Sequence, residues 1–117
     1  MVLRRKVTFQ ILFFMLLVTT WASAQSAVDH FKLGDAAFDA EKCDLAITEY
    51  TKEIEIHPNN TAAYFNRGLA YYNKRSYDAA ITDLSKTIRF DPTNAGAFYR
   101  RGHAHYLKIG GPWGEKK

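Results

Sequence analysis

The sequence predicts an all-α fold in which antiparallel helix pairs stack side by side, and three observations lead to this prediction. Residues 27–60 and 61–94 are similar at a constant offset of 34 residues, a period typical of stacked-repeat architectures. Apolar residues within each copy recur every three or four positions, as in Phe65, Leu69 and Tyr72, which indicates helices buried on one side. Each copy also closes with a proline, a residue that a helix interior does not accept.

Residues 1–24 are expected to be a signal peptide that takes no part in the fold. Basic residues at positions 4–6 precede an apolar run of about a dozen residues, and Ala22 and Ala24 provide small side chains for a cleavage site. A membrane-spanning helix needs about 20 apolar residues, so the run is short for a span. We therefore expect a secreted or periplasmic protein cleaved after Ala24; an uncleaved membrane anchor is the alternative.

Charge is distributed unevenly along the chain. The net charge is +4, but it falls to +1 when the predicted signal peptide is removed, so the total gives no reason to expect a nucleic-acid partner. Residues 27–60 carry a net charge of −5, residues 61–94 carry +2, and residues 95–117 carry +4. The mature chain is therefore predicted to have an acidic front and a basic rear.

Each full copy is expected to form a helix, a tight turn and a second helix. Polar residues at 73–77 interrupt the apolar period, and Asn94 follows the second proline as a good N-cap for the next helix. Glycines at 34, 68 and 102 fall inside first helices, where glycine costs about 1 kcal/mol relative to alanine. We expect Gly34 to face Ala46 and Gly68 to face Ala80, so that the two helix axes can approach closely.

A third copy supplies only a first helix, at residues 95–108. Gly110, Gly111 and Pro112 then break the helical pattern, so residues 109–117 are expected to be an irregular tail. The apolar side of this last helix, with Phe98, Ala104 and Leu107, should be exposed or covered by something else. Three alternatives are open: a homodimer formed through this end, docking on a partner, or a shortened product of a longer protein.

The recurring residues resemble those of a known repeat family. In the second copy they are Tyr64, Arg67, Gly68, Tyr71, Ala80, Leu84, Thr87 and Pro92. This pattern is similar to that of the tetratricopeptide repeat, although Arg67 replaces a large apolar residue and Thr87 replaces an alanine. In the first copy, His30 and Ala37 replace aromatic residues and Glu53 replaces the alanine. The resemblance implies a right-handed α-solenoid with two full repeats, 27–60 and 61–94, and the first helix of a third.

The resemblance also implies a binding site. First helices of successive repeats in this family line a concave groove that holds an extended peptide or a partner's helix. The residues implied here are Phe31, Lys32, Asp35, Phe65, Asn66, Leu69, Tyr99, Arg100 and His103. Asn66 and Arg100 would donate hydrogen bonds to a peptide backbone or carboxylate. The alternative for the aromatic residues is that they form packing core.

Some family members hold a terminal carboxylate with a five-residue clamp. Asn66 and Arg100 match two of its positions, but Phe31, Asp35 and Gly96 do not match the others. A chaperone-type carboxylate clamp is therefore not expected.

No residue pattern indicates catalysis. His103 and His105 are two positions apart, which points them in different directions on a helix, whereas metal-binding pairs need a spacing of three or four. The single cysteine, Cys43, has no internal disulfide partner, so it is either a small buried thiol or a link between two chains. We expect no enzyme, no metal and no cofactor. The prediction is a protein or peptide-binding module; a homo-oligomerisation element is the alternative.

Overall fold

The computed structural model describes residues 8, 10–15 and 28–113. Residues 10–15 are helical and exposed, whereas the predicted cleavage site at Ala24 lies outside the described residues. From residue 28 onward the described chain is helical, without strands, which confirms the predicted fold class. Its elements are α2 (His30–Asp39), α3 (Cys43–Ile56), α4 (Thr61–Asn73), α5 (Tyr77–Phe90), α6 (Ala95–Lys108) and the short 3₁₀ helix η1 (Gly111–Trp113).

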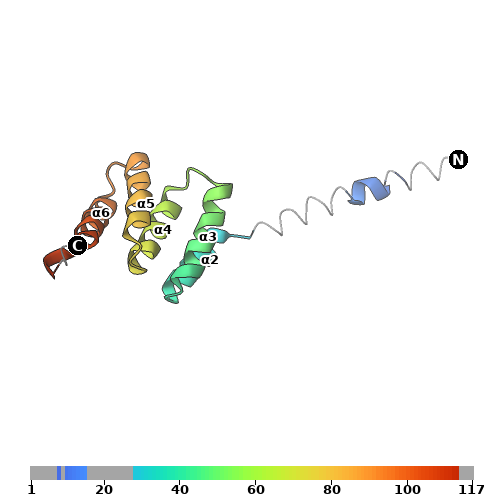
Figure 1. Cartoon of the computed structure of the whole chain (residues 1–117). Helices are drawn as coiled ribbons and strands as arrows, with labels where there is room; N and C mark the ends of the chain where they lie inside the picture. Colours follow the sequence, from blue (N-terminus) through green and yellow to red (C-terminus); the bar gives the residue numbers. More distant parts are fainter. Residues whose placement is uncertain (1–7, 9, 16–27, 114–117) are drawn as a thin grey trace.

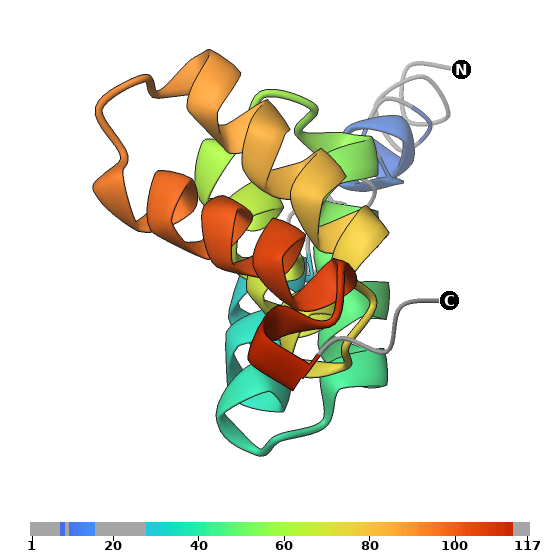
Figure 2. The same cartoon turned by 60° about the vertical axis from the view of Figure 1, so that its left-hand side comes forward.

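The helices form a stack in which each element contacts its neighbours along the chain (Figure 1). α2 pairs with α3 and α4 with α5, while α3 packs on α4 and α5 on α6. The first helices α2, α4 and α6 also contact one another in succession, whereas α3 and α5 do not touch. The first helices therefore form the inner, concave layer of the α-solenoid, and α3 and α5 form the outer layer (Figure 2). Within the described ranges, no helix combines the length and the hydropathy needed to cross a bilayer.

Side-chain caps begin the first helix of each pair. The side chain of Asn60 accepts a hydrogen bond from the backbone N–H of Ala63 at 3.1 Å, and Asn94 accepts one from Ala97 at 2.9 Å. Asp29 begins α2 in the same way. Such caps satisfy N–H groups that have no partner within the helix and stabilise it by about 1 kcal/mol.

The turn inside each pair depends on a left-handed residue that is not glycine. Glu41 has a φ of 59° and Arg75 a φ of 63°, and they lie one repeat apart. The N–H of Lys42, which follows Glu41, bonds the carbonyl of Ala37 at 2.9 Å, the pattern that ends a helix at a left-handed residue. Gly110 follows the C-cap of α6 with a φ of 98°. A left-handed residue therefore follows the C-caps of α2, α4 and α6, and the backbone bond to the carbonyl five residues back is present at the ends of α2 and α4.

Gly34 and Gly68 lie where the two helices of a pair come closest. A Cβ atom built on Gly34 would lie 2.5 Å from Cε1 of Tyr50, and one on Gly68 would lie 3.1 Å from Cγ of Leu84. Both partners are fully buried. Each glycine therefore forms a notch that a large side chain of the second helix fills.

The alanines of the second helices belong to the core between successive repeats. The atoms nearest to a Cβ built on Gly34 belong to Tyr50, and those nearest to a Cβ built on Gly68 belong to Leu84 and Asp83. The expected contact between each glycine and its alanine stays a prediction. Ala46 and Ala80 are themselves fully buried, and they cluster with Ala70 of α4 and Ala97 of α6, respectively. The small side chains thus let the first helix of the next repeat approach the second helix. The larger residues one turn further on, Tyr50 and Leu84, occupy the notches at Gly34 and Gly68 instead.

α6 is covered on one side only in the described part of the chain. Ala97 and Ala104 are fully buried, so the expected exposure of Ala104 is wrong; it lies on the covered side of α6. Phe98 is 45% exposed, and a Cβ atom built on Gly102 would meet no atom within 4 Å. Leu107 is half-buried.

Candidate peptide-binding groove

At the α2 end of the concave layer, two neighbours hold a carboxylate. The phenol of Tyr50 donates to Oδ1 of Asp35 at 2.6 Å, and Nδ2 of Asn66 donates to the same oxygen at 3.0 Å. Burial, and then the hydrogen bond to Asp35, raise the pKa of the Tyr50 phenol above its ordinary value, so the phenol remains a donor. Asn66 has therefore committed an amide hydrogen to Asp35.

At the α6 end, a cluster combines stacked rings with a cation. Tyr72 bonds Nδ1 of His103 through its phenol, and the His103 ring stacks between Tyr99 and Tyr106, with centroid distances of 6.0 and 6.1 Å. The guanidinium carbon of Arg100 lies 5.2 Å from the centroid of Tyr72 and 5.9 Å from that of Tyr99. Tyr99 and Tyr106 are 68% and 43% exposed. These five residues are called the aromatic–arginine cluster below.

The cluster offers two kinds of contact to a ligand. Exposed tyrosine rings give flat, rigid contact area at a small entropic cost. None of the described carboxylates forms an ion pair with Arg100. Its guanidinium group can therefore donate charge-assisted hydrogen bonds to an acidic group of a ligand.

The other predicted site residues are divided between core and surface. Phe31 packs against Tyr50 with a centroid distance of 5.9 Å, and Phe65 packs against the second core cluster; both are half-buried, so each takes part in the core while keeping an exposed edge. Leu69, one turn after Phe65 in α4, is also half-buried. Lys32 is exposed and pairs within its own helix turn.

One buried ion pair was not anticipated from the sequence. Nε and Nη2 of Arg67 donate to the two carboxylate oxygens of Asp83 at 2.7 and 2.9 Å, and Nη1 donates to Thr51 at 3.0 Å. The bond to Asp83 raises the pKa of Arg67. The pair lies in the seam between α4 and α5, outside the groove. A signal for it was present, because Arg67 occupies a position where the repeat pattern has a large apolar residue.

A second polar contact links the helices of the first pair. Nδ1 of His30 lies 2.6 Å from Oε2 of Glu49, and Nζ of Lys52 lies 3.1 Å from its other oxygen. The hydrogen bond to His30, followed by that to Lys52, lowers the pKa of Glu49 below its ordinary value.

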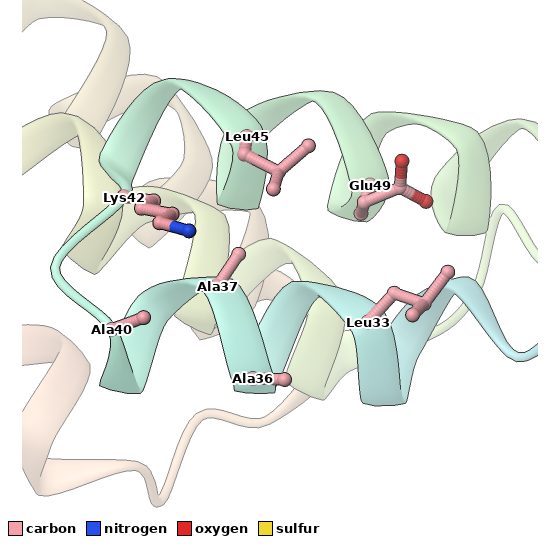
Figure 3. A pocket seen from close by; sticks show the side chains of 7 residues that line it. All are labelled: Leu33, Ala36, Ala37, Ala40, Lys42, Leu45 and Glu49. Carbon is pink, nitrogen blue, oxygen red and sulfur yellow. The ribbon is translucent and has the colours of Figure 1, made fainter.

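An apolar hollow of about 310 Å³ lies at the α2–α3 end of the stack (Figure 3). Its lining residues are Leu33, Ala36, Ala37, Ala40, Lys42, Leu45 and Glu49. Leu33 and Leu45 point into the space between the two helices, and they are 46% and 48% exposed. Its lining residues all come from α2, α3 and the turn between them, and none of them is a predicted groove residue. Sequence reasoning placed no site here.

No three histidine, cysteine, aspartate or glutamate side chains in the described ranges are placed to hold a metal ion. Cys43 is a free, half-buried thiol at the start of α3.

The stacked helix pairs define a helical-repeat protein. A family model for the tetratricopeptide repeat matches residues 31–95, and the chain belongs to this family. Among solved structures, the chain is similar to the TPR domain of Arabidopsis OM64, with 28% sequence identity and a TM-score of 0.66. The match covers 68% of this chain and 66% of that one. No curated protein matches the chain. Tetratricopeptide repeats are in general non-enzymatic modules for protein–protein interaction.

Proposed function

We propose that the chain is an exported, non-enzymatic module that binds a peptide or a partner's helix in the concave groove. The observation that carries this proposal is the aromatic–arginine cluster, in which Tyr99 is 68% exposed beside Arg100. An exposed aromatic surface around an unpaired cation is typical of the residues that dominate protein interfaces.

Charge along the groove defines the ligand's direction. Asp35 lies at the α2 end, in a repeat with a net charge of −5, and Arg100 lies at the α6 end, in a segment with a net charge of +4. A complementary ligand places an acidic group at Arg100, apolar or aromatic side chains over Tyr99 and Tyr106, and a basic group toward Asp35.

The groove is tested with peptides selected from a display library on the full chain. A double variant, Asn66→Ala with Arg100→Ala, should lower the affinity of the selected peptides at least tenfold, measured by fluorescence anisotropy, while the helical circular dichroism stays unchanged. Arg89→Ala, which removes the same charge from an exposed site on the outer helix α5, is the matched control. Equal peptide affinity in the double variant and the wild type refutes the groove assignment.

Export is proposed from the basic head, the apolar run and the small residues at 22 and 24. Mass spectrometry of the protein recovered from its native host should give a mature chain that begins at Gln25. Recovery of the full-length chain in the membrane fraction supports the anchored alternative instead, and recovery of the intact chain in the cytosol excludes both forms of export.

A further inference from the structure

Arg67 on α4 is bound by a carboxylate from its partner helix α5. Its guanidinium group binds the carboxylate of Asp83 with two hydrogen bonds, at 2.7 and 2.9 Å, and the hydroxyl of Thr51 with a third, at 3.0 Å. The guanidinium carbon also lies 5.8 Å from the centroid of the Tyr64 ring. Asp83 comes from the partner helix α5, while Thr51 comes from the preceding repeat.

Arg101 on α6 has the same surroundings except for the carboxylate. Its Nη1 atom lies 3.3 Å from Oγ of Ser85, and its guanidinium carbon lies 5.5 Å from the centroid of Phe98. Both partners stand 34 residues after those of Arg67. None of the carboxylates in the described chain contacts Arg101, and the residue in register with Asp83 is Lys117, which has the wrong charge.

The notch beside Arg101 is empty as well. Leu84 fills the notch at Gly68, but a Cβ atom built on Gly102 would meet no atom within 4 Å. The side of α6 that corresponds to the covered side of α4 is therefore uncovered in the described structure. We call it the open face of α6, and it consists of Phe98, Arg101, Gly102 and His105.

We propose that the open face of α6 binds an amphipathic helix of a partner protein in which an acidic residue is followed directly by a large apolar residue. The carboxylate binds Arg101 beside Ser85, and the apolar side chain covers Gly102. The partner helix thus packs on α6 as α5 packs on α4.

Two observations specify this partner's chemistry. Both second helices of the chain contain the same order, Glu49–Tyr50 in α3 and Asp83–Leu84 in α5, and in each the second residue fills a glycine notch. α6 contains no acidic residue but has three basic ones, Arg100, Arg101 and Lys108, so it attracts an acidic helix and repels a basic one.

This surface is independent of the groove. Residues 99, 100, 103 and 106, which belong to the aromatic–arginine cluster, project from a different side of α6 than residues 98, 101, 102 and 105, because a helix turns by 3.6 residues. One first helix can therefore hold two ligands at once.

The probe is a fluorescent synthetic peptide with the sequence of residues 75–92, which contains α5. A lactam between Asp78 and a lysine introduced by Thr82→Lys, both exposed positions in α5, keeps the peptide helical, and circular dichroism verifies its helicity. We expect it to bind the full chain with 1:1 stoichiometry. Asp83→Asn in the peptide, or Arg101→Gln in the protein, should weaken binding about tenfold or more, because each removes one partner of a desolvated charge pair.

Gly102→Leu in the protein should abolish binding, since its side chain would occupy the notch, where a Cβ atom meets no atom of the described residues within 4 Å. Arg89→Gln is the matched control for loss of a positive charge and should bind as the wild type does. Groove peptides should bind the Gly102→Leu variant with unchanged affinity.

Three results would overturn the proposal. The first is that the helical probe fails to bind. The second is that the probe binds the Arg101→Gln and Gly102→Leu variants as well as it binds the wild type, which means that it replaces α5 within the chain. The third is sedimentation that shows a dimer of the wild type and a monomer of the Gly102→Leu variant, because a second copy of the chain then occupies the open face.

Discussion

The two complete helix pairs share a backbone plan but fill their seams with different side chains. In the α2–α3 pair, the ring of Tyr50 lies in the notch of Gly34; in the α4–α5 pair, the smaller Leu84 lies in the notch of Gly68. A Cβ atom at Gly34 would approach within 2.5 Å of the ring, whereas one at Gly68 would keep 3.1 Å from Leu84. The first pair is therefore the more tightly packed at this contact.

The polar contacts of the two pairs differ in how many charged partners each buried carboxylate has. Arg67 and Asp83 form a bidentate pair whose side chains are 16% and 6% exposed, so neither charge has ready access to water. In the first pair, Glu49 binds both His30 and Lys52, so the loss of one partner leaves the other. The repeat thus fixes where the helices touch, while the chemistry of each contact varies.

The largest expected effect comes from breaking the buried ion pair. Arg67→Met should lower the free energy of unfolding by about 3–5 kcal/mol, because Asp83 would remain buried without a counter-charge. Urea unfolding followed by circular dichroism measures the change. The double variant Arg67→Met with Asp83→Leu should recover most of the loss; a double variant as unstable as the single one contradicts the explanation. His30→Ala should cost less, since Lys52 still binds Glu49.

The two glycine notches should respond differently to one added methyl group. Gly34→Ala should destabilise the chain by about 1–3 kcal/mol, because the buried Tyr50 ring must shift. Gly68→Ala should change stability by no more than about 1 kcal/mol, since the small displacement of Leu84 is offset by the better helix propensity of alanine. Thermal and urea unfolding of both variants provide the comparison, and equal losses would show that the ring packing does not distinguish the two pairs.

A smaller effect is expected from the pH dependence of the first pair. The pKa of Glu49 is lowered in the folded chain from its ordinary value of 4.5. Its stabilising contribution is therefore fully present above pH 4.5 and is lost as the pH falls through the folded pKa. Glu49→Gln should be less stable than the wild type at neutral pH, and this difference should shrink in acid. Glu55→Gln, at an exposed position of the same helix, is the matched control. A difference that does not change with pH argues against the ionic role of Glu49.

Much of the fold follows from the sequence because helical period and repeat offset are local properties. Residues that recur at an offset of 34, together with the breaks after each apolar run, are enough to place the helices without any knowledge of their contacts. The helix offset within a pair is different, because it depends on turns in which Glu41 and Arg75 adopt left-handed backbone. Neither residue type indicates that conformation.

The candidate site was less accessible to prediction than the fold. Arg67 looked like a departure from the repeat pattern, because its partner Asp83 is brought close only by the folded hairpin. Asn66 looked like a free donor, yet Asp35, 31 residues earlier, binds it across two first helices. Such contacts depend on distances between helices, and no local pattern encodes these.

In the described chain each repeat contacts only the repeats next to it, and this has a mechanical consequence. The separation of Asp35 and Arg100 is set by the packing of α2 and α3 on α4 and of α4 and α5 on α6, two interfaces between repeats arranged in series. Small rotations at each interface add along a solenoid, so the two ends of the stack move relative to each other by more than either interface moves alone. The length of ligand that fits the proposed groove therefore depends on the packing at both interfaces.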